Sequence, residues 1–266
     1  MKILLSLISI LFSFCCLAQS DSASPAKKPK WGISVVYNSV EAQIDQQLMN
    51  TWVFPAINYY DNFGDKKNKS YSLSILPEYS INEDMFLRFE LGMTNINLLS
   101  HFNGYHDSVS TGFSVNTIAD DTLQQKIYRF SPGIQLNFMK MKFIEAYCGG
   151  MLNYFHYSEI TWVQNIKSND IPGRGTIYRS TTPGGFAAGI GAFSGFNIYL
   201  NKKIAIGGEI SYSLLYYKLG GTESGMTIST FPTSPTETAI WSVENNKSGG
   251  VQFSKIMPSF HLTIKL

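Results

Sequence analysis

The chain has 266 residues, a formal net charge of +2, 44% hydrophobic residues, 14% aromatic residues and only 15% charged residues. This length suits one large domain or two small ones, and an all-β barrel of this size commonly forms a single unit. The charged fraction is well below the roughly 25% of an average soluble domain, and the absence of a basic block or stripe argues against nucleic acid as a partner.

The first 18 residues have the features of a signal peptide: a positive charge, an apolar run, and small residues at the positions that a peptidase reads, Cys16 and Ala18. We therefore predict an exported protein that is cleaved after Ala18. A lipoprotein would need a small residue before the modified cysteine, whereas Phe14 precedes Cys15. After cleavage the sequence keeps a single cysteine, Cys148, which predicts no internal disulfide and no thiolate metal cluster.

Residues 19–30 are predicted to form a short periplasmic segment, and residues 31–266 a single barrel domain. Beyond the leader no apolar run approaches the roughly 20 residues of a membrane-spanning helix, and the regular stretches alternate apolar and polar residues with the period of β-strands. In chain order, the predicted strands are 31–38, 71–80, 87–94, 128–138, 143–156, 184–200, 204–214 and 258–266.

The links between these strands alternate in length. Three are tight, at 82–84, 139–142 and 201–203, and four are long, at 40–69, 98–125, 157–182 and 218–248. This alternation places all long links at one end, as in outer-membrane barrels with short periplasmic turns and long extracellular loops. The sequence therefore predicts an all-β fold, a transmembrane antiparallel up-and-down β-barrel of eight strands. Ten strands is the alternative, if the apolar segment at 51–60 inserts.

The polar faces of the predicted strands carry single charges among glycine and serine, which suits a small lumen filled by pairs of opposite charge. A turn centred on Glu83 places Glu78 opposite Arg88, and the turn at Lys202 places Glu209 opposite Gly195, which leaves room for the carboxylate to reach across the lumen. The predicted lumen charges are Glu78, Arg88, Glu90, Arg129, Glu145, Glu209 and Lys255.

Aromatic residues flank an aliphatic middle on the apolar faces of these strands. In membrane barrels such residues form girdles at the level of the lipid headgroups. The predicted interface aromatics are Trp31, Tyr37, Tyr71, Tyr79, Tyr128 and Phe138.

Three stretches carry a resemblance to a known family: the leader ending LAQ, the hairpin YLNKKIAIGGEISY, and the closing strand PSFHLTIKL. From Trp31 to Leu266 the chain resembles the small OmpA-like/porin-like "outer membrane protein beta-barrel" family of the Bacteroidetes type. The resemblance implies a location in the bacterial outer membrane. It also implies insertion by the barrel-assembly machinery, which would recognise the closing strand.

Two groups of residues are candidates for a chemical role. In FHYSE, strand alternation places His156 and Ser158 on one face, and the stretch resembles the His-Tyr-Ser core of lipid A deacylase barrels, although Glu159 stands where that family has Asn. His101, His106 and Asp107 carry metal-ligand chemistry at a spacing that fits no standard site. We predict no metal and no cofactor.

The expected function is therefore structural or surface-binding and non-enzymatic, in a monomeric barrel that contacts outer-membrane lipid and lipopolysaccharide. An extracellular ligand or protein is expected to bind the long loops. Strands that rise above the membrane are indicated in these loops by two stretches. One is TWVFPAINYY, and the other is the pair MTISTF and TAIWSV, which PTSP separates. Two alternatives stay open: a narrow porin for small solutes, and a lipid A ester hydrolase.

Overall fold

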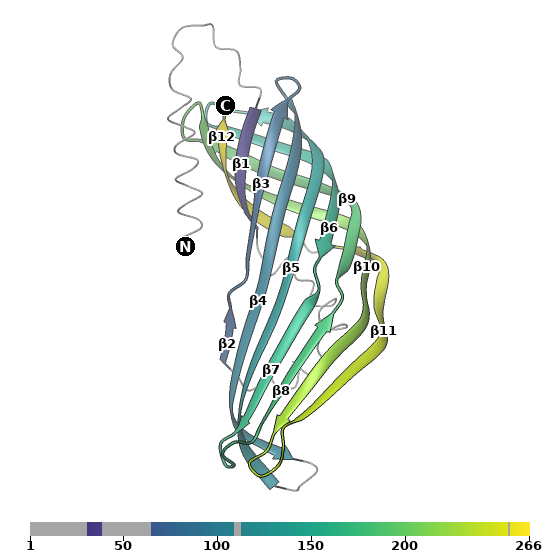
Figure 1. Ribbon diagram of the computed structural model, residues 1–266. Coiled ribbons are helices and arrows are strands. Elements are labelled where there is room, and N and C mark those ends of the chain that lie inside the picture. The colour runs from purple at the N-terminus through teal and green to yellow at the C-terminus, as the bar shows by residue number, and fades with distance from the viewer. Residues whose placement is uncertain (1–30, 39–64, 109–112, 255) are drawn as a thin grey trace.

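The computed structural model describes residues 31–38, 65–108, 113–254 and 256–266. These residues form twelve β-strands (Figure 1) and no α-helix. The strands are β1 (Trp31–Asn38), β2 (Asp65–Asn68), β3 (Tyr71–Ser80), β4 (Met85–Ser108), β5 (Phe113–Lys140), β6 (Ile144–Tyr157), β7 (Ile160–Ser168), β8 (Gly175–Thr182), β9 (Gly185–Tyr199), β10 (Ile204–Thr230), β11 (Glu237–Phe253) and β12 (Met257–Lys265). Within the described ranges, no helix has the length and hydropathy needed to cross a membrane.

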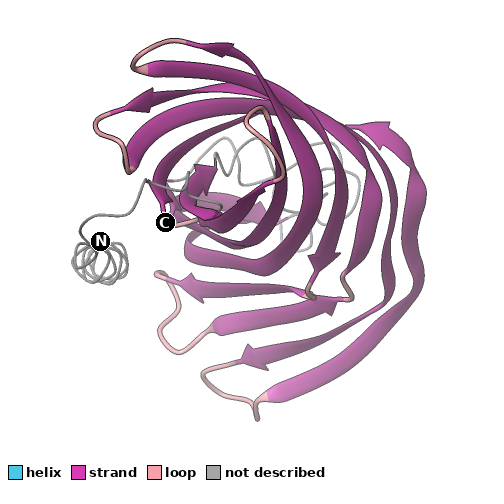
Figure 2. Cartoon of the chain, turned by 90° about the horizontal axis from the view of Figure 1, so that it is seen from above, coloured by secondary structure: helices cyan, strands magenta, loops and turns pink. Residues whose placement is uncertain are grey.

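Eight of the described strands form a closed antiparallel circuit, in the order β1, β3, β4, β5, β6, β9, β10 and β12. The last strand closes on the first, and the backbone N–H of Leu266 donates to the carbonyl of Trp31 at 2.9 Å. Figure 2, which looks along the barrel, shows the strands curving into a ring. The predicted fold class is thereby confirmed.

The short turns and the end of the chain lie together at one end of the molecule, the top of Figure 1. In the turn before β4 the Asn82 side chain accepts backbone N–H groups, among them that of Met85 at 2.8 Å, and Asn201 does the same before β10. This side-chain mimic of a backbone turn sets the register of each hairpin. Glu78 pairs with Arg88 and Glu209 with Gly195, so both predicted registers are confirmed.

Three of the long segments, at 98–125, 157–182 and 218–248, are largely β-sheet where the structure describes them, and the first, at 40–69, lies mostly outside the described residues. Strands β4 and β5 pair as far as Ser108 and Phe113, β7 and β8 lie between β5 and β10, and β11 pairs with β10. We name this part the outer extension: residues 95–126, β7, β8, residues 218–230 of β10 and residues 237–250 of β11, insofar as they are described. Pairing satisfies the backbone donors and acceptors that a long loop would leave to water.

The hairpin expected from MTISTF and TAIWSV is confirmed, because Met226 pairs with Ile240 and Ile228 with Thr238. The segment TWVFPAINYY lies outside the described residues. The ten-strand alternative that depends on this segment therefore stays a prediction.

Besides Pro258 at the second position of β12, two prolines lie inside barrel strands, where each removes one backbone hydrogen-bond donor. The pairing of β3 with β4 passes from Ile75 directly to Glu78, and skips Pro77. The pairing of β5 with β6 likewise passes from Phe130 to Gly133, and skips Pro132. Each proline thus lies where the ladder on one side is already interrupted.

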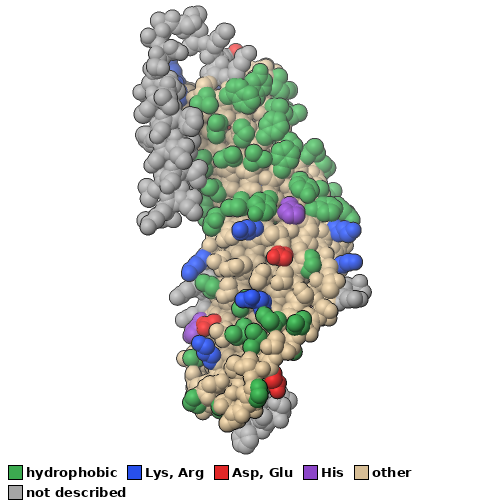
Figure 3. Space-filling view, viewed as in Figure 1, with side chains coloured by type: hydrophobic (Ala, Val, Ile, Leu, Met, Phe, Trp, Pro, Cys, Tyr) green, Lys and Arg blue, Asp and Glu red, His purple; other side chains and the backbone are tan. Residues whose placement is uncertain are grey.

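The outward faces around the closed circuit form an apolar belt. On β5 the outward stripe runs from Tyr128 to Phe138 and includes Ile134, whose side chain is 47% exposed. At ~3.3 Å per residue and a tilt of ~40°, this stripe covers roughly 25 Å along the barrel axis, the height of the apolar band in outer-membrane barrels. Hydrophobic side chains cover the upper half of the visible face in Figure 3, and polar and charged groups dominate the lower half. We name the belted part the membrane section.

Candidate functional site

The inward side of the membrane section is lined by polar side chains. Ser34, Ser72, Ser131, Ser213 and Thr263 are all at most 2% exposed. Some pair directly, as Ser34 and Thr263 do at 2.7 Å across β1 and β12. A barrel of this size has an interior just wide enough for side chains to fill, and here these side chains are polar.

One ion pair spans the lumen between strands that are not neighbours in the circuit. Arg88 on β4 donates to both carboxylate oxygens of Glu209 on β10, at 2.7 and 3.1 Å, and both residues are buried. The Tyr147 hydroxyl donates to the same carboxylate at 3.1 Å, and the Arg88 guanidinium lies 4.0 Å from the centre of the Phe193 ring. Bidentate geometry, a third donor and the aromatic face together offset the cost of removing these charges from water.

Two glycines make room for the rings that surround this pair. A Cβ atom at Gly149 would lie 2.3 Å from Phe193, its cross-strand partner. A Cβ atom at Gly195 would lie 2.6 Å from the Tyr147 hydroxyl, again across the same strand pair. The glycines of β6 and β9 therefore allow two large aromatic side chains to fill a narrow lumen.

A second ion pair lies nearer the outer end. Arg129 on β5 donates to Glu90 on β4 at 3.0 Å and to Ser131 at 3.0 Å, with Asn153 of β6 at 3.4 Å. Asn153 continues the chain of hydrogen bonds by donating to Ser213 of β10 at 2.8 Å. The network thus joins β4, β5, β6 and β10 through the lumen.

The end near the short turns holds a third pair. Lys265 of the terminal strand lies 3.6 Å from Glu145, and Tyr199 donates to the same carboxylate. His261 of β12 also faces the lumen and contacts Asn197 at 2.7 Å.

Of the predicted lumen charges, Glu78, Arg88, Glu90, Arg129, Glu145 and Glu209 lie on inward-facing positions, and Lys255 lies outside the described residues. Sequence reasoning did not include Lys265, Tyr147 and Phe193 among the lumen residues. Lys265 could have been found, because it falls on the polar half of the terminal alternation. The two aromatic residues could not, because aromatic residues in a membrane barrel are expected outside.

Directly beyond the charged network, the interior becomes apolar. A buried cluster of side chains from β4, β5, β6, β7, β9 and β10 lies between the lumen and the outer extension, and we name it the apolar junction. Its buried members are Ile96, Leu123, Ile127, Phe155, Ile160, Ala187 and Leu215, with Leu98, Tyr157, Trp162 and Tyr217 packed against them.

The predicted interface aromatics lie on outward-facing positions. Trp31 and Tyr79 contact each other near the short turns, with ring centroids 4.9 Å apart, and Phe138 is 65% exposed at the same end. Tyr37, Tyr71 and Tyr128 are exposed on the outward faces toward the outer extension. This arrangement gives one aromatic level at each edge of the apolar belt.

The candidate catalytic pair, His156 and Ser158, is not assembled. His156 faces outward and stacks on Tyr128, with ring centroids 6.3 Å apart. The Ser158 hydroxyl accepts the backbone N–H of Lys126 at 2.9 Å and donates to the carbonyl of Glu159 at 3.1 Å. No hydrogen bond joins the two side chains in the part of the chain that the structure describes, and Ser158 acts as a link where β6 passes into β7.

The expected metal ligands are only partly described. His101 lies 2.6 Å from Asp120 on the exposed face of β4 and β5, and the side chains of His106 and Asp107 lie outside the described set. Among the described side chains, no group of three or more His, Cys, Asp and Glu could hold a metal ion.

Comparisons with known proteins give likenesses to solved structures alone. No protein-family model and no curated protein matches the chain. The outer membrane protein OprG from Pseudomonas aeruginosa is 10% identical, with a TM-score of 0.34 over 91% of this chain and 98% of that one. CarO2 of Acinetobacter baumannii is also 10% identical, with a TM-score of 0.34 over 91% and 100%.

The outer membrane protease OmpT from Escherichia coli is 10% identical, with a TM-score of 0.29 over 90% of this chain and 94% of that one. These low values assign no activity. The strand pairings, the polar interior and the apolar belt together identify the chain as a β-barrel of the outer-membrane type.

Proposed function

We propose that this protein is a non-conducting, non-enzymatic barrel of the bacterial outer membrane whose outer extension is its binding surface. In this proposal the leader directs export, the barrel-assembly machinery inserts the chain, and the barrel works as a monomer of the small OmpA-like/porin-like type. The membrane section holds the extension at a fixed height above the lipid.

The proposal rests on two different barriers to ions, which follow each other along the interior of the barrel. The Arg88–Glu209 pair crosses the lumen with Tyr147 and Phe193 packed around it. The apolar junction lies on the side of this layer that faces the outer extension. Its residues Leu123 and Ile96 are each 1% exposed. A hydrated ion that passed the charged layer would have to lose its water to cross the junction, which is strongly unfavourable.

Contact with lipopolysaccharide is supported by charge at the edge of the belt. Lys126 on β5 and Lys218 on β10 are exposed and outward-facing, each one outward position beyond a tyrosine of the belt, Tyr128 and Tyr216 respectively. Phosphate groups of the outer leaflet would meet these two ammonium groups at headgroup level.

The test is planar-bilayer conductance of the refolded full-length protein. We expect no ion current from the wild type. Leu123→Ser weakens the apolar junction and is the variant in which a leak of ions would be easiest to detect. Gln124→Ser, on the outward face of the same strand, serves as its control. Stepwise currents from the wild type that change with Arg88→Ala would establish the narrow pore and overturn the proposal.

The lipid A hydrolase alternative has a separate test. We expect lipid A isolated from cells that express the protein to have the same mass distribution as lipid A from cells without it. A deacylated species that disappears with Ser158→Ala would show catalysis and refute the non-enzymatic role.

A further inference from the structure

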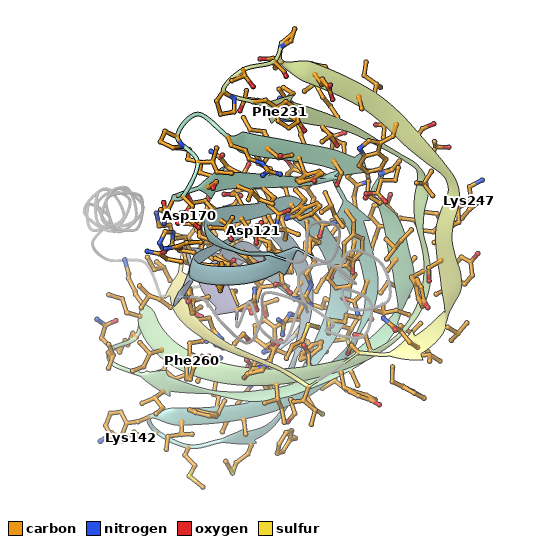
Figure 4. All side chains as sticks on the ribbon, turned by 90° about the horizontal axis from the view of Figure 1, so that it is seen from below. Asp121, Lys142, Asp170, Phe231, Lys247 and Phe260 are labelled. Carbon is orange, nitrogen blue, oxygen red and sulfur yellow. The ribbon has the colours of Figure 1, made fainter. Side chains whose placement is uncertain are left out.

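Two lysines and two glycines form a square on the outward face of β10 and β11, which we name the lysine square. In the strand register Lys218 pairs with Gly249, and Gly220 pairs with Lys247. Both lysine side chains are exposed. In Figure 4, which views the molecule from the end opposite the short turns, Lys247 points away from the ring of strands. The lysines thus occupy one diagonal of the square and the glycines the other.

The two ammonium groups can reach one ligand. Diagonal neighbours on paired antiparallel strands lie roughly 7–8 Å apart, and a lysine carries its charge on a long, flexible stem. The other two corners hold glycines, so no side chain stands between the lysines. A Cβ atom at Gly249 would already lie 3.3 Å from the carbonyl oxygen of Tyr217. The floor of the square is therefore bare backbone that a ligand can approach.

Neither charge of the lysine square is paired within the described part of the chain. The ion pairs of the described side chains draw their cations from a different set of residues, namely Arg88, His101, Arg129, Lys140 and Lys265. Like charges on neighbouring strand positions repel each other. An anion that contacts both ammonium groups would remove this repulsion.

The lysine square lies at the outer edge of the apolar belt. Lys218 is one outward position beyond Tyr216, which is 50% exposed, and Figure 3 shows Lys and Arg side chains directly below the hydrophobic belt. On the membrane side of the square, Val251 and Phe253 of β11 are 67% and 62% exposed. Phe253 stacks on Tyr212, with ring centroids 5.5 Å apart. An apolar path thus runs from the square into the belt.

This pattern selects an amphiphile with a phosphate headgroup. A phosphate monoester carries a charge of roughly −1.5 to −2 at neutral pH and three strong acceptor oxygens, which suit two ammonium donors that converge from neighbouring strands. A free anion would leave the apolar path unused, and a neutral lipid would leave the lysines unused. The outer leaflet holds lipopolysaccharide in the proposed function, and its lipid A part has both a phosphate and acyl chains.

We propose that the lysine square binds one phosphate group of lipid A, with Lys218 and Lys247 donating to its oxygens. Acyl chains of the same molecule lie over Val251 and Phe253. This inference rests on the proposed function, because it assigns the lipopolysaccharide contact to one site. Lys126 lies at the same edge on β5, but neither of the neighbouring strands β4 and β6 contains a lysine, so it contributes general attraction alone.

The experiment is native mass spectrometry of the refolded full-length protein in detergent micelles, which counts bound lipid molecules. The probes are bisphosphorylated lipid A, the same lipid A after enzymatic dephosphorylation, and phosphatidylglycerol. We expect one lipid A molecule to bind, with affinity about 10-fold or more above that of the other two lipids. Lys218→Gln and Lys247→Gln should each lower the affinity for lipid A about 10-fold, because each removes one charge-assisted hydrogen bond.

Two matched variants remove a lysine elsewhere. Lys126→Gln, at the same edge of the belt, should lower the affinity for lipid A less than about 2-fold, because a lone exposed charge contributes little. Lys142→Gln, at the short turns, should leave it unchanged. All four lysines are exposed, so these variants should fold as the wild type does.

The site would be overturned by a lack of bound lipid A, or by equal affinity for lipid A and its dephosphorylated form. Phosphatidylglycerol that binds as tightly as lipid A would show a general phospholipid surface and overturn it as well. Equal losses from Lys126→Gln and Lys247→Gln would reduce the contact to general attraction, with the same consequence. A failed site with a silent bilayer leaves the non-conducting barrel standing, whereas wild-type ion currents with intact lipid A binding would overturn that function alone.

Discussion

The same strands build two regions whose outward faces differ in polarity. In the membrane section β5 points Arg129, Ser131 and Gln135 inward, and its outward stripe from Tyr128 to Phe138 is apolar. In the outer extension the same strand points Leu123 inward and exposes Gln124 on the outside. The change occurs within a few residues, at the level where β6 passes into β7.

This comparison shows that strand alternation is one pattern with two meanings. A strand in lipid exposes its apolar residues and hides its polar ones, and a strand in water does the reverse, while the backbone geometry is the same in both. The apolar junction is the place where the two interiors meet. A barrel wall can therefore continue beyond the membrane where its outward-facing residues change from apolar to polar.

The largest expected effect comes from Arg88→Met in the lumen. Removing the guanidinium leaves the Glu209 carboxylate buried without its ion-pair partner, and we expect the free energy of unfolding to fall by about 3–5 kcal/mol. Lys140 and Asp84 form a pair of the same 2.7 Å separation, with both side chains at least 37% exposed, so Lys140→Met should cost at most about 1 kcal/mol.

Urea unfolding of the refolded barrel measures both variants. Arg88→Met combined with Glu209→Gln should recover part of the loss, because the isolated charge is gone. Equal effects from Arg88→Met and Lys140→Met would mean that the lumen pair is solvated, contrary to the closed interior.

The second expected effect compares two outward positions of β5. Ile134→Arg places a charge in the apolar belt, near the middle of the stripe, and should cost about 2–4 kcal/mol. Gln124→Arg adds the same side chain to the outward face of the outer extension, where water solvates it, and should cost less than about 0.5 kcal/mol. The measurement is the free energy of unfolding in lipid vesicles. Similar costs at the two positions would mean that no membrane boundary lies between them.

The smallest expected effect is a pH dependence of the outer extension. The pKa of the Asp121 carboxyl is about 6 in the folded protein and 3.8 in its reference state, so the folded state holds the proton more tightly. Stability from this group is therefore fully present below pH ~4 and lost as the pH rises through about 6.

Urea titrations followed by tryptophan fluorescence at pH 5 and pH 7.5 check this prediction. The urea midpoint of the wild type should be lower at pH 7.5 than at pH 5. This difference in midpoint should be smaller in Asp121→Asn. An identical pH dependence in the two proteins would mean that Asp121 is solvated.

Sequence patterns predicted most of the membrane section. Alternation located all the strands of the closed circuit, and counting across short turns set Glu78 opposite Arg88 and Glu209 opposite Gly195. These predictions succeed because register within a hairpin is a local property of the turn. The outer extension was harder to predict, because Gly, Ser, Thr and Asn are frequent there and are typical of loops as well as of polar strand faces.

The sequence by itself determined which residues form the barrel strands, which face of each strand is apolar, and which hairpins are tight. Only the tertiary structure decided that Arg88 pairs with Glu209 on the far side of the lumen, that Phe193 lies over its guanidinium, and that Asp121 is buried beside Gln164. The physical reason is closure. Contacts across the lumen and between separate hairpins depend on how eight strands curve into one ring, and alternation along a single strand carries no information about which strand lies opposite.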